Sequence, residues 1–286
     1  MKDHLYRAKS FTPSRSSTAV KICLPRRRLW RRRVSICGLA MLVNFVIGGT
    51  QKGGTSALDS FLRQHPQICM PETKKELHYF DKEENFAGRP KYKTYHANFK
   101  PGSQHRVIGE ATPIYMYWNA APQRIWSYNP KMKWIMVLRN PVERAFSAWN
   151  MEAKRDAERL SFKEAVEREP ERCREALPLQ HRVFSYIDRG FYSAQVRRIF
   201  NIFGRENCLI LLNEDLRNNH KDTLRGVFDF LAVDHNIIPN EASVFEHDYD
   251  ATIDPDLCCS LMETFYFDIK ELERLLQRDL SAWYAK

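Results

Sequence analysis

A glycine-rich segment between an apolar strand and an amphipathic helix constrains the fold of this 286-residue chain more than any other feature. Residues 42–47 (LVNFVI) form an apolar run with only Asn44 as a polar residue inside it, which is typical of a strand covered on both faces. The segment GGTQKGGTS follows at 48–56. The apolar residues after it have helical spacing and share one face: Ala57, Leu58, Phe61 and Leu62. Strand, loop and helix in this order indicate the first unit of an α/β fold.

The same alternation of strand and helix continues along the chain. KWIMVLR at 133–139 is a second buried strand, and Pro141 then occupies the first turn of a helix, where its missing N–H costs nothing. Two more strands are predicted at 107–110 and 207–213. Three more helices are predicted at 192–203, 221–231 and 255–280. This order predicts an α/β protein with a P-loop-like three-layer fold, in which helices flank a central parallel sheet.

The net charge of +10 lies entirely in the N-terminal segment. Residues 1–33 contain eleven Lys and Arg side chains and a single acid, Asp3, whereas the rest of the chain contains 34 basic and 34 acidic residues. The segment has no hydrophobic period. We therefore expect residues 1–40 to be a disordered basic extension and residues 41–286 to form the folded domain, for which no nucleic-acid partner is expected.

The apolar run after the basic cluster bears on localisation. It extends for 14 residues, from Val34 to Ile47, whereas a membrane-spanning helix needs about 20. Its second half is also needed for the first strand. The seven scattered cysteines show no metal-binding spacing and favour a reducing compartment. We therefore expect a cytoplasmic protein without membrane contact, and a secretory or membrane-anchoring N-terminus is the alternative.

The glycine-rich segment has the composition of an anion-binding loop. Glycines allow the backbone to approach an anion, and the N–H groups at the start of the following helix add partial positive charge. Because the loop follows a parallel strand, it lies at the edge of the sheet where ligands bind. The residues expected to bind the anion combine one charge, two glycines and two hydroxyls: Lys52, Gly53, Gly54, Thr55 and Ser56.

This segment differs from the P-loop of nucleoside triphosphatases, GxxxxGK[ST]. Gly48 and Gly53 have the right separation, but Gly54 occupies the lysine position and Lys52 precedes the glycine pair. No predicted strand ends in an aspartate that would supply the magnesium-binding half of such a site. A small-molecule kinase or another nucleotide enzyme with a variant P-loop is therefore the second interpretation. A non-catalytic protein whose basic tail binds polyanions is the third.

Four segments resemble the sulfotransferases that use 3′-phosphoadenylyl sulfate (PAPS), in particular the heparan sulfate N- and 3-O-sulfotransferases and their bacterial relatives. KGGTSAL at 52–58 is similar to their loop for the 5′-phosphosulfate, and LRNPVERAFSAWN at 138–150 to their segment for the 3′-phosphate. KKELHYFD at 74–81 resembles the segment that carries their catalytic glutamate, and RGFYSAQ at 189–195 is a fourth match. The resemblance covers residues 42–286.

The resemblance implies transfer of a sulfuryl group from PAPS to a hydroxyl or amine of an acceptor, a carbohydrate or glycoconjugate, leaving adenosine 3′,5′-bisphosphate. Glu76 would be the general base, and Lys52 would stabilise the departing phosphate. Arg139 and Ser147 would bind the 3′-phosphate, since eight residues span about two helical turns. His78 lies on the same face as Glu76 if the segment is extended, where it would orient the base or the acceptor. No metal is expected.

Two segments depart from the family pattern. GEATPIY at 109–115 has Ala111 where the heparan enzymes commonly have a lysine, in EKTP. FEHDYDATIDPDL at 245–257 stands where those enzymes have a basic Lys-Gly-Arg loop, and residues 234–286 contain 12 acids and 4 bases. Both features argue against a polyanionic acceptor of the heparan type.

Overall fold

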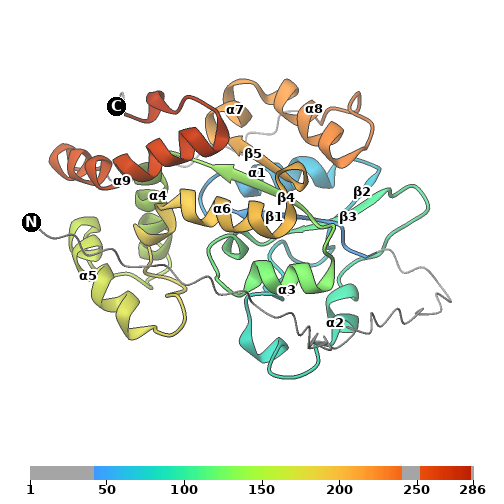
Figure 1. Ribbon diagram of the computed structural model, residues 1–286, viewed down its shortest axis with the longest axis horizontal. Coiled ribbons are helices and arrows are strands. Elements are labelled where there is room, and N and C mark those ends of the chain that lie inside the picture. Colours follow the sequence, from blue (N-terminus) through green and yellow to red (C-terminus); the bar gives the residue numbers. More distant parts are fainter. Residues whose placement is uncertain (1–41, 240–251, 285–286) are drawn as a thin grey trace, which may run out of the picture. The chain divides into compact units, whose positions relative to one another are not determined.

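A five-stranded parallel sheet forms the centre of the computed structural model, which describes residues 42–239 and 252–284 (Figure 1). The strands are β1 (Phe45–Gly49), β2 (Ile68–Cys69), β3 (Val107–Ala111), β4 (Lys133–Leu138) and β5 (Cys208–Leu212). Their order is β2-β3-β1-β4-β5, and every neighbouring pair is parallel. The predicted α/β class with a central parallel sheet is confirmed.

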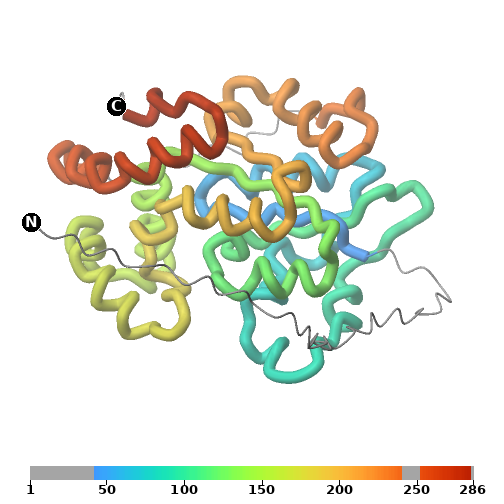
Figure 2. Tube along the Cα trace, in the orientation of Figure 1, coloured from blue at the N-terminus to red at the C-terminus, as the bar shows by residue number. Residues whose placement is uncertain are grey.

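Helices connect the strands and follow the last one. The α-helices are α1 (Thr55–Arg63), α2 (Tyr92–His96), α3 (Ala121–Tyr128), α4 (Pro141–Ala153), α5 (Phe162–Glu175), α6 (Tyr192–Phe203), α7 (Asn213–Asn218), α8 (His220–Leu231) and α9 (Pro255–Leu276). The short 3-10 helices are η1 (Glu83–Asn85), η2 (Pro113–Tyr115), η3 (Asp188–Gly190), η4 (Arg205–Asn207) and η5 (Ser281–Trp283). The tube in Figure 2 follows this path from β1, in blue, to α9, in red.

The sheet separates two apolar cores, because successive side chains of a strand point to opposite faces. On one face Trp134 and Met136 of β4 pack with residues of α3, α4, α6 and α9. On the other face Ile135 and Val137 pack with residues of α1, α7 and α8. All five residues of β1 are buried. Helices thus cover both faces of the sheet (Figure 1), and the predicted three-layer arrangement is confirmed.

The connections leave the sheet accessible to a ligand at one edge, at the carboxyl end of the central strand, β1. From β1 the chain runs through α1 to β2 and β3 on one side, and then through α3 to β4 on the other side of β1. Ligands of open α/β sheets bind where the direction of winding reverses in this way. The loops that follow β1, β3, β4 and β5 meet at this edge, and they carry the site described below.

Most predicted elements lie within a few residues of the observed ones. The helix predicted at 255–280 is too long: it ends at Leu276, because Gln277 adopts the left-handed conformation with φ 54°. The basic extension at 1–40 and residues 245–251 of the acidic segment lie outside the described residues. Within residues 42–239 and 252–284, none of the helices has the length and apolar character needed to cross a membrane.

Candidate active site

The loop between β1 and α1 folds back onto β4. The N–H of Thr50 donates to the carbonyl oxygen of Val137 at 3.0 Å, and the N–H of Gly53 donates to that of Thr50 at 3.0 Å. Lys52 and Gly54 turn the chain with φ values of 67° and 110°. A Cβ on Gly53 would lie 2.1 Å from the carbonyl oxygen of Val137, so a glycine is required there. The close approach of the loop to β4 explains Gly53, and the left-handed conformation explains Gly54.

The start of α1 is arranged to receive an anion. Gly54 occupies the N-cap without a side-chain hydrogen bond, and the first turn of the helix contains no acid. The first N–H groups of the helix and its dipole therefore attract a negative group. Thr55 and Ser56 place their hydroxyls at the same end. From the other side Asn213 Nδ2 donates to the Gly53 carbonyl oxygen at 2.9 Å and fixes the loop.

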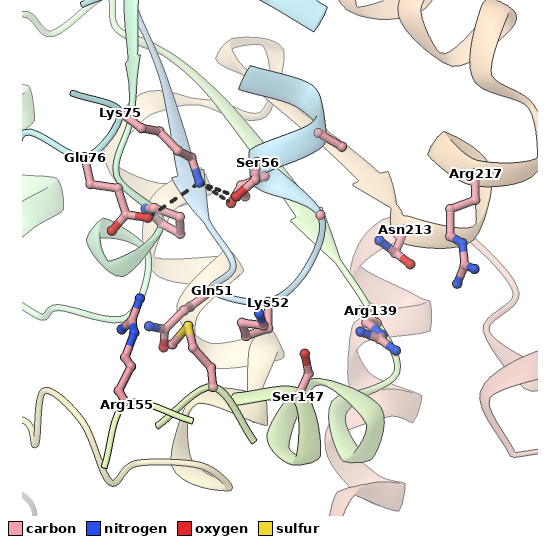
Figure 3. A pocket seen from close by; sticks show the side chains of 15 residues that line it. Gln51, Lys52, Ser56, Lys75, Glu76, Arg139, Ser147, Arg155, Asn213 and Arg217 are labelled. Atoms are coloured by element: carbon pink, nitrogen blue, oxygen red, sulfur yellow. Dashed lines mark hydrogen bonds and ion pairs between the residues drawn. The ribbon is translucent and has the colours of Figure 1, made fainter. Parts of the chain in front are cut away.

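A pocket of about 310 Å³ opens in front of this loop (Figure 3). It is lined by Gln51, Lys52, Gly54, Thr55, Ser56, Ala57, Lys75, Glu76, Pro113, Arg139, Ser147, Met151, Arg155, Asn213 and Arg217. Of the predicted site residues, Gly53 and His78 alone are not in this lining. The described lining contains five basic side chains and one acidic side chain, Glu76. The pocket is therefore suited to a ligand with several negative charges.

Arg139 and Ser147 reach the pocket from the junction of β4 and α4. The side chain of Asn140 caps α4 by accepting hydrogen bonds from the first turn, so the helix begins directly after Arg139. Ser147 lies two turns along the helix and faces the same pocket (Figure 3). Arg139 Nη2 lies 3.0 Å from Glu143 Oε2, and Tyr192 donates its hydroxyl to the Arg139 carbonyl oxygen at 2.9 Å. The predicted convergence of Arg139 and Ser147 on one site is present in the structure.

Glu76 and His78 belong to a chain of ion pairs beside the pocket. His78 Nε2 lies 3.2 Å from Glu76 Oε2, and His78 Nδ1 lies 3.0 Å from Asp81 Oδ2. The hydrogen bonds to Asp81 and Glu76 raise the pKa of His78 to about 9, so its imidazole carries a charge at neutral pH. Burial raises the pKa of Glu76, but the bond from His78 and the charge of Lys75 outweigh it and lower that pKa overall. Glu76 is therefore an ionised carboxylate at neutral pH.

The contact between Glu76 and His78 has a different cause from the predicted one. The extended backbone on which that prediction depended is not present at His78, which adopts a left-handed conformation with φ 51°. Residues Leu77–Tyr79, which we call the turn at His78 for this left-handed residue, bring both imidazole nitrogens to carboxylates. Asp81 is fully buried and also binds Arg182 Nη1 at 2.6 Å. Asp81 was not predicted as a site residue. The signal in the sequence is its position three residues after His78.

Lys75 is a second site residue that the sequence did not single out. Its Nζ donates to Ser56 Oγ at 2.8 Å and lies 3.4 Å from Thr55 Oγ1 and 3.5 Å from Glu76 Oε1 (Figure 3). One ammonium group therefore connects the start of α1 with the carboxylate of Glu76. The part of the chain that the structure describes contains no cluster of three or more metal-ligating side chains. Independence of metal stays a prediction.

The chain resembles known proteins over most of its length. Residues 43–248 match the family model of the sulfotransferase domain. The sulfotransferase of Alicyclobacillus acidocaldarius, known from its crystal structure, is 34% identical in sequence. It aligns with a TM-score of 0.74, and the alignment covers 84% of this chain and 98% of that one.

Curated relatives match parts of longer proteins. The membrane-associated sulfotransferase kil1 of Dictyostelium discoideum is 36% identical over 39% of this chain and 23% of the relative. The human bifunctional heparan sulfate N-deacetylase/N-sulfotransferase 3 is 28% identical over 72% of this chain and 24% of its own length. Mouse heparan sulfate glucosamine 3-O-sulfotransferase 3A1 is 28% identical over 68% of this chain and 47% of its own length. This chain thus spans less than half of each of these three relatives. The domain match and the bacterial structure together show that the chain belongs to the sulfotransferase family.

Proposed function

We propose that this protein transfers the sulfuryl group of PAPS to a hydroxyl or amine of an acceptor and releases adenosine 3′,5′-bisphosphate. The observation that carries the proposal is that one pocket is lined by the start of α1, by Arg139 and Ser147 and by Glu76. These groups come from three separate segments of the chain. PAPS carries negative charge at both its 5′ and 3′ ends, and it needs two anion subsites in one pocket.

Each of the two subsites would bind one end of the donor. The loop with Gly53 and Gly54, together with Lys52, Thr55 and Ser56, would bind the 5′-phosphosulfate by backbone N–H groups, hydroxyls and one charge. Arg139 and Ser147 would bind the 3′-phosphate, for which a guanidinium offers a planar pair of donors. This division assigns a role to each basic or hydroxyl residue predicted from the sequence.

The transfer step requires a base and a stabilised leaving group. A bond forms between the sulfur and the acceptor oxygen or nitrogen, and the bond between the sulfur and the bridging oxygen of the donor breaks. Glu76 would take the acceptor proton, and it is ionised at neutral pH because His78 and Lys75 lower its pKa. Lys52 and the N–H groups of α1 would stabilise the charge that develops on the departing 5′-phosphate.

A carbohydrate or glycoconjugate is the acceptor class that we propose, because the names of two curated relatives refer to heparan sulfate. Ala111, fully buried at the end of β3, does not supply the lysine that the heparan enzymes commonly have there. We therefore propose an acceptor with less negative charge than heparan. The cytoplasmic location stays a prediction, since residues 34–41 lie outside the described residues and the Dictyostelium relative is named membrane-associated.

Binding and transfer assays with the full chain test the proposal. Adenosine 3′,5′-bisphosphate should bind in the presence of EDTA, and labelled sulfate should move from PAPS to members of a panel of neutral and amino sugars. ATP with Mg²⁺ is the comparison that addresses a kinase. Hydrolysis of ATP or phosphorylation of an acceptor, without binding of adenosine 3′,5′-bisphosphate, would contradict the proposal.

Arg139→Gln should weaken binding of adenosine 3′,5′-bisphosphate by about 10- to 100-fold, since a hydrogen bond to a charged group contributes about 1.5–3 kcal/mol. Its effect on adenosine 5′-phosphosulfate, which lacks the 3′-phosphate, should be small. Calorimetric titration with both nucleotides measures the difference. Arg225→Gln, on the exposed surface of α8, is the matched control. Equal losses for both nucleotides would remove Arg139 from the 3′-phosphate subsite.

A further inference from the structure

Glu110 is a buried carboxylate that does not line the pocket. It lies in β3, in register with Val46 of β1, and is fully buried. Its Oε1 accepts hydrogen bonds from the hydroxyls of Tyr95 at 2.7 Å and Tyr115 at 3.0 Å. Its Oε2 accepts one from Thr112 Oγ1 at 2.6 Å. Three hydroxyls, one from α2 and two from the segment that follows β3, therefore converge on one carboxylate.

Two of these hydroxyls also hold the backbone of the segment that carries Glu76. Thr112 Oγ1 accepts a hydrogen bond from the N–H of Leu77 at 3.1 Å. The hydroxyl oxygen of Tyr115 accepts one from the N–H of Tyr79 at 3.1 Å. These two amides lie on either side of His78, the residue with the left-handed conformation. The turn that brings His78 to Glu76 is thus anchored at both of its ends.

The direction of these hydrogen bonds follows from the charge of Glu110. An ionised carboxylate only accepts hydrogen bonds, and a hydroxyl has a single proton to donate. Thr112 and Tyr115 therefore direct their protons to Glu110, and their lone pairs face the two amides. A group at position 110 that donated a proton would remove the acceptor for one hydroxyl proton, so that hydroxyl would rotate and its lone pairs would no longer be held toward the amide. The carboxylate thus determines that both hydroxyls act as acceptors for the turn.

We propose that Glu110 is a positioning residue, which fixes the turn at His78 through Thr112 and Tyr115 and so holds Glu76 in place. The inference rests on the proposed function, in which Glu76 is the base. The inference assigns a role to Glu110 of the GEATP segment. In the sequence that segment drew attention only because Ala111 replaces a lysine. A base that is displaced by about 1 Å can lose about 100-fold in rate, so a buried support of this kind affects turnover.

The surroundings of Glu110 make its charge sensitive to pH near neutrality. Burial raises the pKa of Glu110 to about 7, although the hydroxyls of Thr112, Tyr95 and Tyr115 lower it, and the charge of Asp81 raises it further. The tyrosines that face it, Tyr95, Tyr115 and Tyr128, have pKa values raised by burial and stay neutral. Glu110 therefore becomes protonated as the pH falls through about 7, and one of the hydroxyls that support the turn then loses its acceptor.

Two tyrosine variants form a matched test. Tyr95→Phe and Tyr115→Phe each remove one hydroxyl that donates to the same oxygen of Glu110, but only the Tyr115 hydroxyl accepts a hydrogen bond from the turn. Tyr115→Phe should lower kcat by about 10- to 100-fold, and Tyr95→Phe by less than about threefold. Binding of adenosine 3′,5′-bisphosphate should not change in either variant, because neither residue lines the pocket. Equal kcat values in the two variants would overturn the proposal.

The titration of His78 gives a readout that does not depend on turnover. The imidazole resonance of His78, assigned by its loss in His78→Asn, should titrate near 9 in the wild type and in Tyr95→Phe. In Tyr115→Phe it should shift toward 6.5, because the relaxed turn separates the imidazole from its carboxylates. An unchanged titration in Tyr115→Phe would overturn the positioning role even if the wild type transferred no sulfate from PAPS. Absence of transfer by the wild type would instead refute the proposed function.

Glu110→Gln tests the carboxylate itself, since the amide keeps the shape and adds a donor. The kcat of the wild type should fall as the pH is lowered through about 7, and this dependence should be absent in Glu110→Gln. Glu169→Gln is the control, because burial raises the pKa of Glu169 to about 7 as well, and its carboxylate accepts hydrogen bonds from the N–H groups of Ile187 and Asp188 and not from residues of the turn. If Tyr115→Phe does not fold, Thr112→Val and its rescue by Thr112→Ser make the same comparison through Leu77. A pH dependence that persists in Glu110→Gln would refute the role of its charge.

Discussion

Replacement of Glu76 by glutamine should lower kcat by about 10²- to 10⁴-fold, the range for loss of a general base. The amide has nearly the same shape as the carboxylate but cannot take up the acceptor proton. Affinity for adenosine 3′,5′-bisphosphate should stay the same, since the groups that would bind its phosphates are untouched. Transfer of labelled sulfate gives kcat, and calorimetric titration gives the dissociation constant.

Glu72→Gln is the matched control for this substitution. Glu72 precedes the same segment, pairs with Lys100 and does not line the pocket, so its loss should leave turnover unchanged. Wild-type activity in the Glu76→Gln protein would discard Glu76 as the base. A loss of nucleotide binding together with turnover would mean that Glu76 supports the donor site instead.

Lys52→Ala should lower kcat by about 10²- to 10³-fold, the usual cost of removing one group that stabilises a developing negative charge. The alanine keeps the Cβ of Lys52, so the substitution adds no new strain at the left-handed position with φ 67°. Single-turnover measurements at saturating PAPS separate this effect from weaker donor binding, which is also expected because the charge attracts the donor in the ground state.

Lys74→Ala is the control for the loss of positive charge. Lys74 is exposed, lies close to the site in sequence and does not line the pocket. It should keep the wild-type rate. A single-turnover rate in Lys52→Ala that equalled the wild-type rate would show that the N–H groups of α1 suffice for the leaving phosphate.

The elements that were predicted from the sequence are those in which local patterns and packing agree. The apolar runs predicted where β1 and β4 lie, and the proline predicted where α4 begins. Helix α5 was not predicted, because it buries few residues and contains Pro170. A capping box formed by Ser161 and Glu164 starts α5, and the ring of Phe162 packs against Phe146. The two-residue strand β2 is too short for any period to appear.

One part of the candidate site could be predicted from the sequence, and another part could not. The loop at 52–56 and the segment from Arg139 to Ser147 are contiguous motifs, so the sequence was sufficient to select them. The support around His78 depends on a single left-handed residue and on Arg182, which is 101 residues further along the chain than Asp81. Neither spacing nor composition reports contacts of this kind, because they arise only when the chain folds.

The positive charges around the start of α1 also make the stability of the fold depend on its ligand. Lys52, Lys75 and Arg139 line one pocket with Glu76 as the single acid among the described lining residues, and like charges held together repel one another. An anion that binds only the folded chain, at 100 times its dissociation constant, stabilises it by about 2.7 kcal/mol. Because unfolded chains are degraded in cells, the abundance of this protein would rise and fall with the supply of its sulfate donor.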